Sequence, residues 1–191
     1  MFKIVSQNIR DYLCKTLGSP VHILGYSGAI SHELIGENGH VHSLIRANQY
    51  ECIFLSIGQN DLNKIDFSEF TAEIAGKVLI ENIIEKLKHF EGLELRLVVL
   101  PITLRDVAHT SKFAEAKSPH YIKRINEIIV NMYRNIGTQP KNVHFIDPSF
   151  IHRLQRQEKL TVEDGLHLED HGKKIVLHES LQQFLQWKKQ G

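Results

Sequence analysis

A short apolar segment that ends in a polar turn is the feature that most constrains the fold of this chain. Residues 52–56 read Cys-Ile-Phe-Leu-Ser, and the turn Gly58-Gln59-Asn60-Asp61 follows one isoleucine later. This pattern is typical of a buried strand that stops at a tight turn. Open α/β sheets bind their ligands at the carboxyl ends of such strands. Asn60 and Asp61 therefore either serve a reaction centre or only cap the turn through their own side-chain hydrogen bonds.

Apolar segments that alternate with helical periodicity predict an α/β fold. Strands that are separated by helices form a parallel sheet with helices on both faces. We expect a five-stranded parallel sheet, with a loop over 103–119 that crosses the carboxyl ends of the strands. The predicted strands are 2–5, 21–24, 52–56, 93–100 and 143–146, and the predicted helices are 9–17, 31–35, 40–47, 66–90, 121–136 and 168–189. The helix over 66–90 is predicted to begin with an N-cap at Asp66 and to bury Ile74, Val78, Ile83, Ile84 and Leu87.

Length and charge restrict the class of protein. The 191 residues suit a single domain over 1–191. With 23 basic and 22 acidic residues, the net charge of +1 gives no electrostatic argument for nucleic acid or an acidic membrane. We find no signal peptide and no apolar run that would span a bilayer, so we expect a cytoplasmic protein without a membrane partner. Cys14 and Cys52 are expected to be small buried residues, which fits a reducing compartment.

The twelve histidines are scattered along the chain. His40 and His42 are the only close pair, and no cysteine or acidic residue completes a ligand set at useful spacing. We therefore expect neither a metal nor another cofactor.

A second polar turn, Asp164-Gly165-Leu166-His167, lies just before the last predicted helix. At this spacing the carboxylate can bond to one imidazole nitrogen, which leaves the other nitrogen to act as a general base. The alternative is that Asp164 is an ordinary Asp-Gly turn residue and His167 merely begins the helix.

Three short blocks follow the second, third and last predicted strands, at the same rim of the sheet. They are Tyr26-Ser27-Gly28-Ala29, Gly58-Gln59-Asn60-Asp61 and Asp164-Gly165-Leu166-His167. In this order and spacing, over almost the whole chain, the sequence resembles the SGNH hydrolase superfamily, the GDSL-type esterases and lipases. The resemblance implies a three-layer α/β/α domain, of flavodoxin-like type, with a Ser-His-Asp site. It also implies that His167 is the base, that Asp164 orients it, and that the Gly28 N–H and the Asn60 side chain stabilise an oxyanion.

The first block departs from the family pattern, in which a Gly-Asp-Ser turn after the first strand supplies the nucleophile. Here the junction reads Ser6-Gln7-Asn8. Matching the following helix without gaps puts Gln7 at the nucleophile position, and glutamine cannot serve. A shift of one residue makes Ser6 the nucleophile. Ser27 faintly resembles a nucleophile elbow, but no second glycine follows at position 30, so we interpret it as a turn residue.

Two function classes remain open. The first is a hydrolase of small acyl or acetyl esters that uses Ser6, His167 and Asp164. The second is a catalytically inactive SGNH-fold module that binds RNA or a protein partner, as in the OSK domain of Oskar. Its RNA contacts would come from basic residues at positions 123–124, 153–159 and 188–189. The chain is also compatible with being one module of a longer protein, such as the esterase-like domains that accompany some retroelement reading frames.

Overall fold

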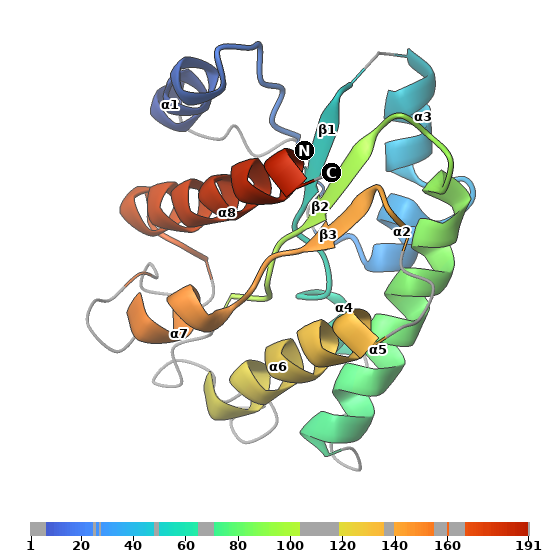
Figure 1. Cartoon of the computed structure of the whole chain (residues 1–191). Helices are drawn as coiled ribbons and strands as arrows, with labels where there is room; N and C mark the ends of the chain where they lie inside the picture. Colours follow the sequence, from blue (N-terminus) through green and yellow to red (C-terminus); the bar gives the residue numbers. More distant parts are fainter. Residues whose placement is uncertain are drawn as a thin grey trace.

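The computed structural model describes residues 7–24, 26, 28–47, 50–64, 71–103, 119–135, 140–154, 160 and 167–190. Three parallel strands form a sheet in the order β1-β2-β3, with β2 in the middle (Figure 1). Leu97 of β2 lies opposite Ile53 of β1 and Val143 of β3. The strands are β1 (Cys52–Leu55), β2 (Arg96–Val99) and β3 (Val143–Phe145).

The prediction of five strands is not met by the residues that the structure describes, which form three. Residues 2–5 lie outside the described part of the chain. Residues 21–24 are described, but they contain no strand, and Leu24 is 44% exposed. Apolar character alone predicted this strand, whereas a strand also needs a hydrogen-bonded neighbour. Segment 21–24 pairs with none of the three described strands.

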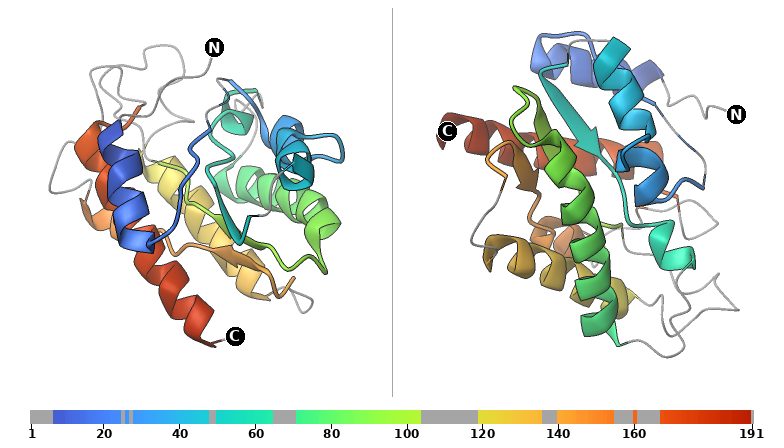
Figure 2. Two further views of the ribbon diagram at one scale, coloured as in Figure 1. Left: turned by 90° about the horizontal axis from the view of Figure 1, so that it is seen from above. Right: turned by 90° about the vertical axis from the view of Figure 1, so that its right-hand side faces the viewer.

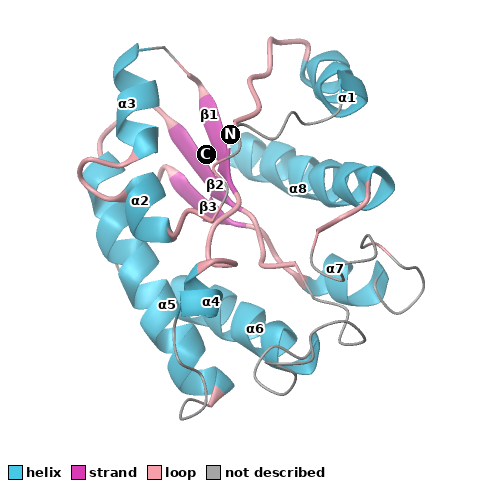
Figure 3. Cartoon of the chain, turned by 180° about the vertical axis from the view of Figure 1, so that it is seen from behind, coloured by secondary structure: helices cyan, strands magenta, loops and turns pink. Residues whose placement is uncertain are grey.

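Helices cover both faces of the sheet (Figures 1 and 3). On one face the ring of Phe145 packs 4.4 Å from that of Tyr133 in α6, and α6 packs along α5. On the other face the ring centroids of Phe54 and of Phe184 in α8 are 5.4 Å apart, and α1 packs against α8. The helices are α1 (Gln7–Leu17), α2 (Ser31–Ile35), α3 (His40–Ala47), α4 (Asp61–Lys64), α5 (Ala72–Leu87), α6 (Pro119–Asn135), α7 (Ser149–Leu154) and α8 (Asp170–Gln190), and a 3-10 turn, η2 (Lys88–Phe90), extends α5.

Helix α5 begins later than the sequence predicted, and two of its five predicted core residues are exposed, whereas Ile83, Ile84 and Leu87 are buried as predicted. It starts at Ala72, and the Thr71 hydroxyl accepts the N-terminal hydrogen bond from Ile74 N, whereas Asp66 lies outside the described residues. Ile74 is 45% and Val78 38% exposed, so neither belongs to the core. In the first half of the helix the buried positions are Ala75, Gly76, Leu79 and Ile80, and Gly76 lets α6 approach closely. A Cβ there would lie 3.0 Å from Cγ2 of Ile128. The buried residues of α5 are Ala75, Gly76, Leu79, Ile80, Ile83, Ile84 and Leu87.

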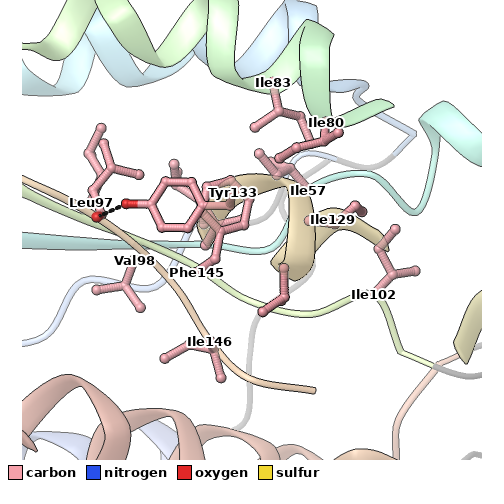
Figure 4. Close-up of a cluster of buried hydrophobic side chains, with 14 of the residues drawn as sticks. Ile57, Ile80, Ile83, Leu97, Val98, Ile102, Ile129, Tyr133, Phe145 and Ile146 are labelled. Carbon is pink, nitrogen blue, oxygen red and sulfur yellow. Dashed lines mark hydrogen bonds between the residues drawn. The ribbon is translucent and has the colours of Figure 1, made fainter. Parts of the chain in front are cut away.

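The core between the sheet and the α5/α6 layer is built from branched aliphatic side chains (Figure 4). Ile57, Ile80 and Ile102 are each buried to 5% exposure or less, and they meet where the strands end. Burial of this kind contributes about 1.5–3 kcal/mol for each large side chain. The core therefore extends to the polar turn after β1 and gives that turn a rigid base. No helix in the described part of the chain is long and apolar enough to cross a bilayer.

The outer edge of β3 is occupied by side chains from two helices. The Tyr133 hydroxyl of α6 donates to the carbonyl of Val143. Gln183 of α8 accepts from the backbone N–H of Asp147 at 2.8 Å and donates to its carbonyl at 3.2 Å. Beside this edge, His144 stacks on Trp187 with ring centroids 4.9 Å apart.

Candidate active site

The turn after β1 depends on a glycine for two reasons. Gly58 has φ +93°, which is a left-handed conformation that L side chains rarely adopt. A Cβ at this position would also lie 3.0 Å from Cδ1 of Ile102 and 3.4 Å from Cδ2 of Leu79. The Gly58 carbonyl then accepts from Leu62 N at 3.0 Å, at the start of α4. The conformation of Gly58 therefore determines the path of the chain after β1 and, with it, the position of Asn60.

A loop from another part of the chain meets this turn. Gly28 in that loop has φ +72°, and open space surrounds the position of a Cβ. The backbone conformation, and not crowding, thus favours glycine there. Nδ2 of Asn60 donates to the carbonyl oxygen of Ala29 at 2.9 Å. The structure thereby brings together two predicted site residues, Gly28 and Asn60, that are far apart in sequence.

A second connection lies one residue further along the turn, at Asp61, and two residues further along the loop, at Ser31. The Asp61 carboxylate accepts from the hydroxyl of Ser31 at 2.6 Å and from its backbone N–H at 3.0 and 3.2 Å. Ser31 is only 2% exposed and is the first residue of α2. The sequence analysis missed Ser31, because a single serine before a short helix resembles any N-terminal turn residue.

A third polar residue, Asn126 of α6, was also missed. It is 2% exposed, and its side-chain amide accepts from Ile102 N at 2.9 Å and donates to Ile102 O at 2.7 Å. Both backbone groups of Ile102 are therefore satisfied away from water. The available signal was a polar residue on the apolar face of a helix, between Ile125 and Ile129. Asn126 of α6 thus fixes the backbone of Ile102, whose side chain lies beside Gly58.

The histidine predicted as the base lies just before α8. His167 is exposed and precedes the first residue of α8 by three positions. The backbone beside it is fixed, because Glu169 N donates to Leu160 O at 2.8 Å. Figure 2 shows that α4 and the beginning of α8 lie at the same end of the molecule, where the strands end.

The other predicted catalytic residues cannot be placed. Ser6 and Asp164 lie outside the described residues, and so does Ser27, which we interpret as a turn residue. Gln7 is the first residue of α1, so Ser6 directly precedes that helix in sequence. The structure therefore tests neither the nucleophile nor its pairing with His167.

Three of the basic residues proposed for RNA binding, Lys123, Arg124 and Lys188, form ion pairs. Arg124 contacts Glu73 at 2.9 Å and Glu127 at 3.5 Å, and its hydrogen bond to Glu73 raises the pKa of the guanidinium. Lys188 contacts Glu51. Acidic neighbours thus neutralise part of this charge.

No cluster of three or more histidine, cysteine or acidic side chains suited to a metal ion occurs within the described ranges. The His42 ring stacks on Phe90 at 4.4 Å, and burial, aided by Arg46, lowers the pKa of His42.

The family model of GDSL-like lipases and acylhydrolases matches residues 3–180. The chain therefore belongs to this family of esterase- and lipase-type hydrolases. No curated protein has significant sequence similarity to it.

Solved structures with hydrolase folds resemble the chain at low sequence identity, so they bear on the fold alone. One is a Streptococcus pneumonia protein provisionally described as a platelet activating factor, with 20% identity, a TM-score of 0.57, and 93% of this chain and 79% of that chain covered. Another is a family 3 carbohydrate esterase from Talaromyces cellulolyticus, with 15% identity, a TM-score of 0.53, and coverage of 87% and 72%. A third is an alpha/beta hydrolase from the metagenome of Lake Arreo, Spain, with 10% identity, a TM-score of 0.53, and coverage of 91% and 77%.

Proposed function

We propose that this protein is a serine hydrolase of carboxylic esters with small acyl groups, such as acetyl. The observation that carries the proposal is the contact between the Asn60 amide and the loop of Gly28, at 2.9 Å from Ala29 O. This contact joins Asn60, at the carboxyl end of β1, to the residue that follows Gly28, and an oxyanion-stabilising site requires two such donors close together. Membership of the GDSL-like family supports the reaction class.

In the proposed reaction Ser6 attacks the acyl carbonyl, and His167 removes the hydroxyl proton. The Gly28 N–H and the Asn60 Nδ2–H stabilise the oxyanion of the tetrahedral intermediate. His167 then protonates the leaving alcohol, and an acyl-Ser6 ester remains. Water, deprotonated by His167, hydrolyses that ester and restores Ser6. Asp164 holds the imidazole in the tautomer that these steps need.

Labelling with a fluorophosphonate, read by intact mass and peptide mapping, tests the nucleophile. We expect one adduct on Ser6 in the wild-type protein, no adduct in Ser6→Ala, and much slower labelling in His167→Ala. Ser27→Ala is the matched control and should label like the wild type. An adduct on Ser27 would show that the block assignment is wrong. No adduct on a folded sample would contradict the hydrolase proposal.

The second candidate function is an inactive SGNH-fold module that binds RNA or protein. The position of Gln7 at the start of α1 favours it, since gap-free matching puts Gln7 at the nucleophile position. The pairing of Arg124 and Lys188 with glutamates weighs against an RNA surface. Binding of a single-stranded RNA that weakens steeply with salt, from a sample without labelling, would favour this candidate.

A further inference from the structure

Two neighbouring connections join the Gly28 loop to the turn after β1. Asn60 bonds to the carbonyl of Ala29, and Asp61 bonds to the backbone and hydroxyl of Ser31. Residues 60–61 and 29–31 are about 30 positions apart in sequence, and these hydrogen bonds join the two segments at this point. A carboxylate that accepts several hydrogen bonds holds its partner more firmly than a neutral group does.

The two connections have different roles. The Asn60 amide bonds to the segment that carries Gly28, so its amide plane is set by that loop. The hydrogen bonds between Asp61 and Ser31 are separate from the bond between Asn60 and Ala29, and Ser31 is buried, with 2% exposure. If Ser31 moves relative to Asp61, the Gly28 N–H and Asn60 Nδ2 move relative to each other.

We propose that Ser31 and Asp61 are positioning residues that set the separation of the Gly28 N–H and the Asn60 side-chain amide. This inference rests on the proposed ester hydrolysis for its catalytic consequence, because a shared oxyanion requires both donors at hydrogen-bond distance at once. Ser31 and Asp61 touch no reacting atom in this scheme and act only through the two donors. Misplacement by about 1 Å can lower a rate about 100-fold.

The test compares Ser31→Ala and Asp61→Asn with a matched control at the opposite end of the sheet. Ser31→Ala removes the hydroxyl donor and keeps the backbone bond, and Asp61→Asn removes the charge and keeps the shape. The control is Asn142→Ala, which deletes bonds of similar length to Phe90 O at 2.8 Å and Leu95 O at 3.0 Å. Each variant is assayed for kcat and KM on p-nitrophenyl acetate. The NMR amide signals of Gly28 and of the Asn60 side chain are recorded on the same samples.

We expect kcat to fall about 10- to 100-fold in Ser31→Ala and Asp61→Asn, with KM changed less than about threefold. The Gly28 and Asn60 signals should shift in both variants, and Asn142→Ala should change neither kcat nor these signals. A double variant that loses no more kcat than Asp61→Asn alone would support a single shared role. A kcat loss equal to that of Asn142→Ala, or unchanged Gly28 and Asn60 signals, would overturn the inference.

Failure of the ester hydrolase proposal is recognised separately. In that case the wild-type protein turns over no ester and takes no fluorophosphonate. Shifted Gly28 and Asn60 signals in Ser31→Ala, with unchanged signals in Asn142→Ala, then support the positioning role without turnover. Unshifted signals overturn it.

Discussion

Side-chain amides join distant backbone segments at both ends of the sheet, but the two ends differ in which segments the amides join. At the carboxyl end Asn60 bonds to Ala29, and Asn126 bonds to Ile102. At the amino end Asn142 bonds to the carbonyls that precede β2. The bonds have the same chemistry and similar lengths. Glycines in left-handed conformations lie near both ends, Gly28 and Gly58 at the carboxyl end and Gly92 at the amino end. Of these bonds, the one between Asn60 and Ala29 joins two of the predicted sequence blocks.

Charge differs between the ends as well. At the amino end, Glu51 contacts Lys188 and Arg96, and the hydrogen bond from Lys188 lowers the pKa of the Glu51 carboxyl. At the carboxyl end, Asp61 accepts from the uncharged donors of Ser31. Exposed ion pairs contribute little to stability. The amino end therefore has an exposed ion-pair cluster, whereas the carboxylate at the carboxyl end is held by the donors of the buried Ser31.

The largest expected effect is that of His167→Ala. Removal of the proposed base should lower kcat on p-nitrophenyl acetate by about 10⁴-fold. The matched control is His178→Ala in α8, whose ring contacts the hydroxyl of Tyr12 and not the candidate site. Turnover in His167→Ala that equals that of His178→Ala would contradict the assignment of the base.

The next largest effect is that of Asn60→Ala, which is compared with Asn142→Ala at the amino end of the sheet. Asn60→Ala should lower kcat about 10²- to 10³-fold, because an oxyanion donor is lost. Asn142→Ala should leave kcat unchanged and lower the free energy of unfolding by about 1–3 kcal/mol, because the carbonyls of Phe90 and Leu95 lose the hydrogen bonds from the Asn142 amide. Steady-state kinetics and urea unfolding of both variants provide the measurement. If Asn142→Ala lost as much kcat as Asn60→Ala, the distinction between the ends would fail.

A third prediction compares two glycines with positive φ. Gly92 has φ +82° with open space around it, and Gly58 has φ +93° against Ile102 and Leu79. Gly92→Ala should cost about 1 kcal/mol of unfolding free energy from backbone strain. Gly58→Ala should cost about 3 kcal/mol, because overpacking adds to the strain. Thermal or urea unfolding measures both, and equal losses would show that the core yields at Ile102.

The smallest expected effect concerns pH and the middle of β3. Burial, with Arg134 nearby, lowers the pKa of His144 below its ordinary value of 6.5. The unfolded chain therefore binds more protons than the folded one just below pH 6.5, and stability falls as the pH drops through that window. In His144→Gln the loss of stability between pH 7.5 and 5.5 should be smaller, although His42 acts in the same direction. Parallel melting-temperature curves for the two proteins would contradict this.

The sequence predicted those elements whose signal is local. The helices over 31–35 and 40–47 have the predicted bounds, and strands β1 and β3 lie within the predicted apolar segments. The predicted start of α5 was wrong, because Asp66 and Thr71 are both favourable N-cap residue types and the sequence pattern does not distinguish between them; the helix begins after Thr71. Helix α7 was not predicted, because six residues give too little periodicity.

For the candidate site, the sequence predicted the motif residues but not the buried polar residues that hydrogen-bond to the segments around them. Gly28 and Asn60 could be named because short motifs mark them. Ser31 and Asn126 act through contacts with residues 24 or more positions away, and no local pattern encodes such contacts. The roles of Ser6, Asp164 and His167 stay predictions.

The side chains on the outer edge of β3 affect how this protein meets other chains. An exposed strand edge is a template for pairing with a foreign strand, and this leads to aggregation. Tyr133 already bonds to the Val143 carbonyl, and Gln183 to both backbone groups of Asp147. A foreign strand would have to displace both side chains before it could extend the sheet there. Two helices of the hydrophobic layers thus also protect the folded chain from fibril-like association.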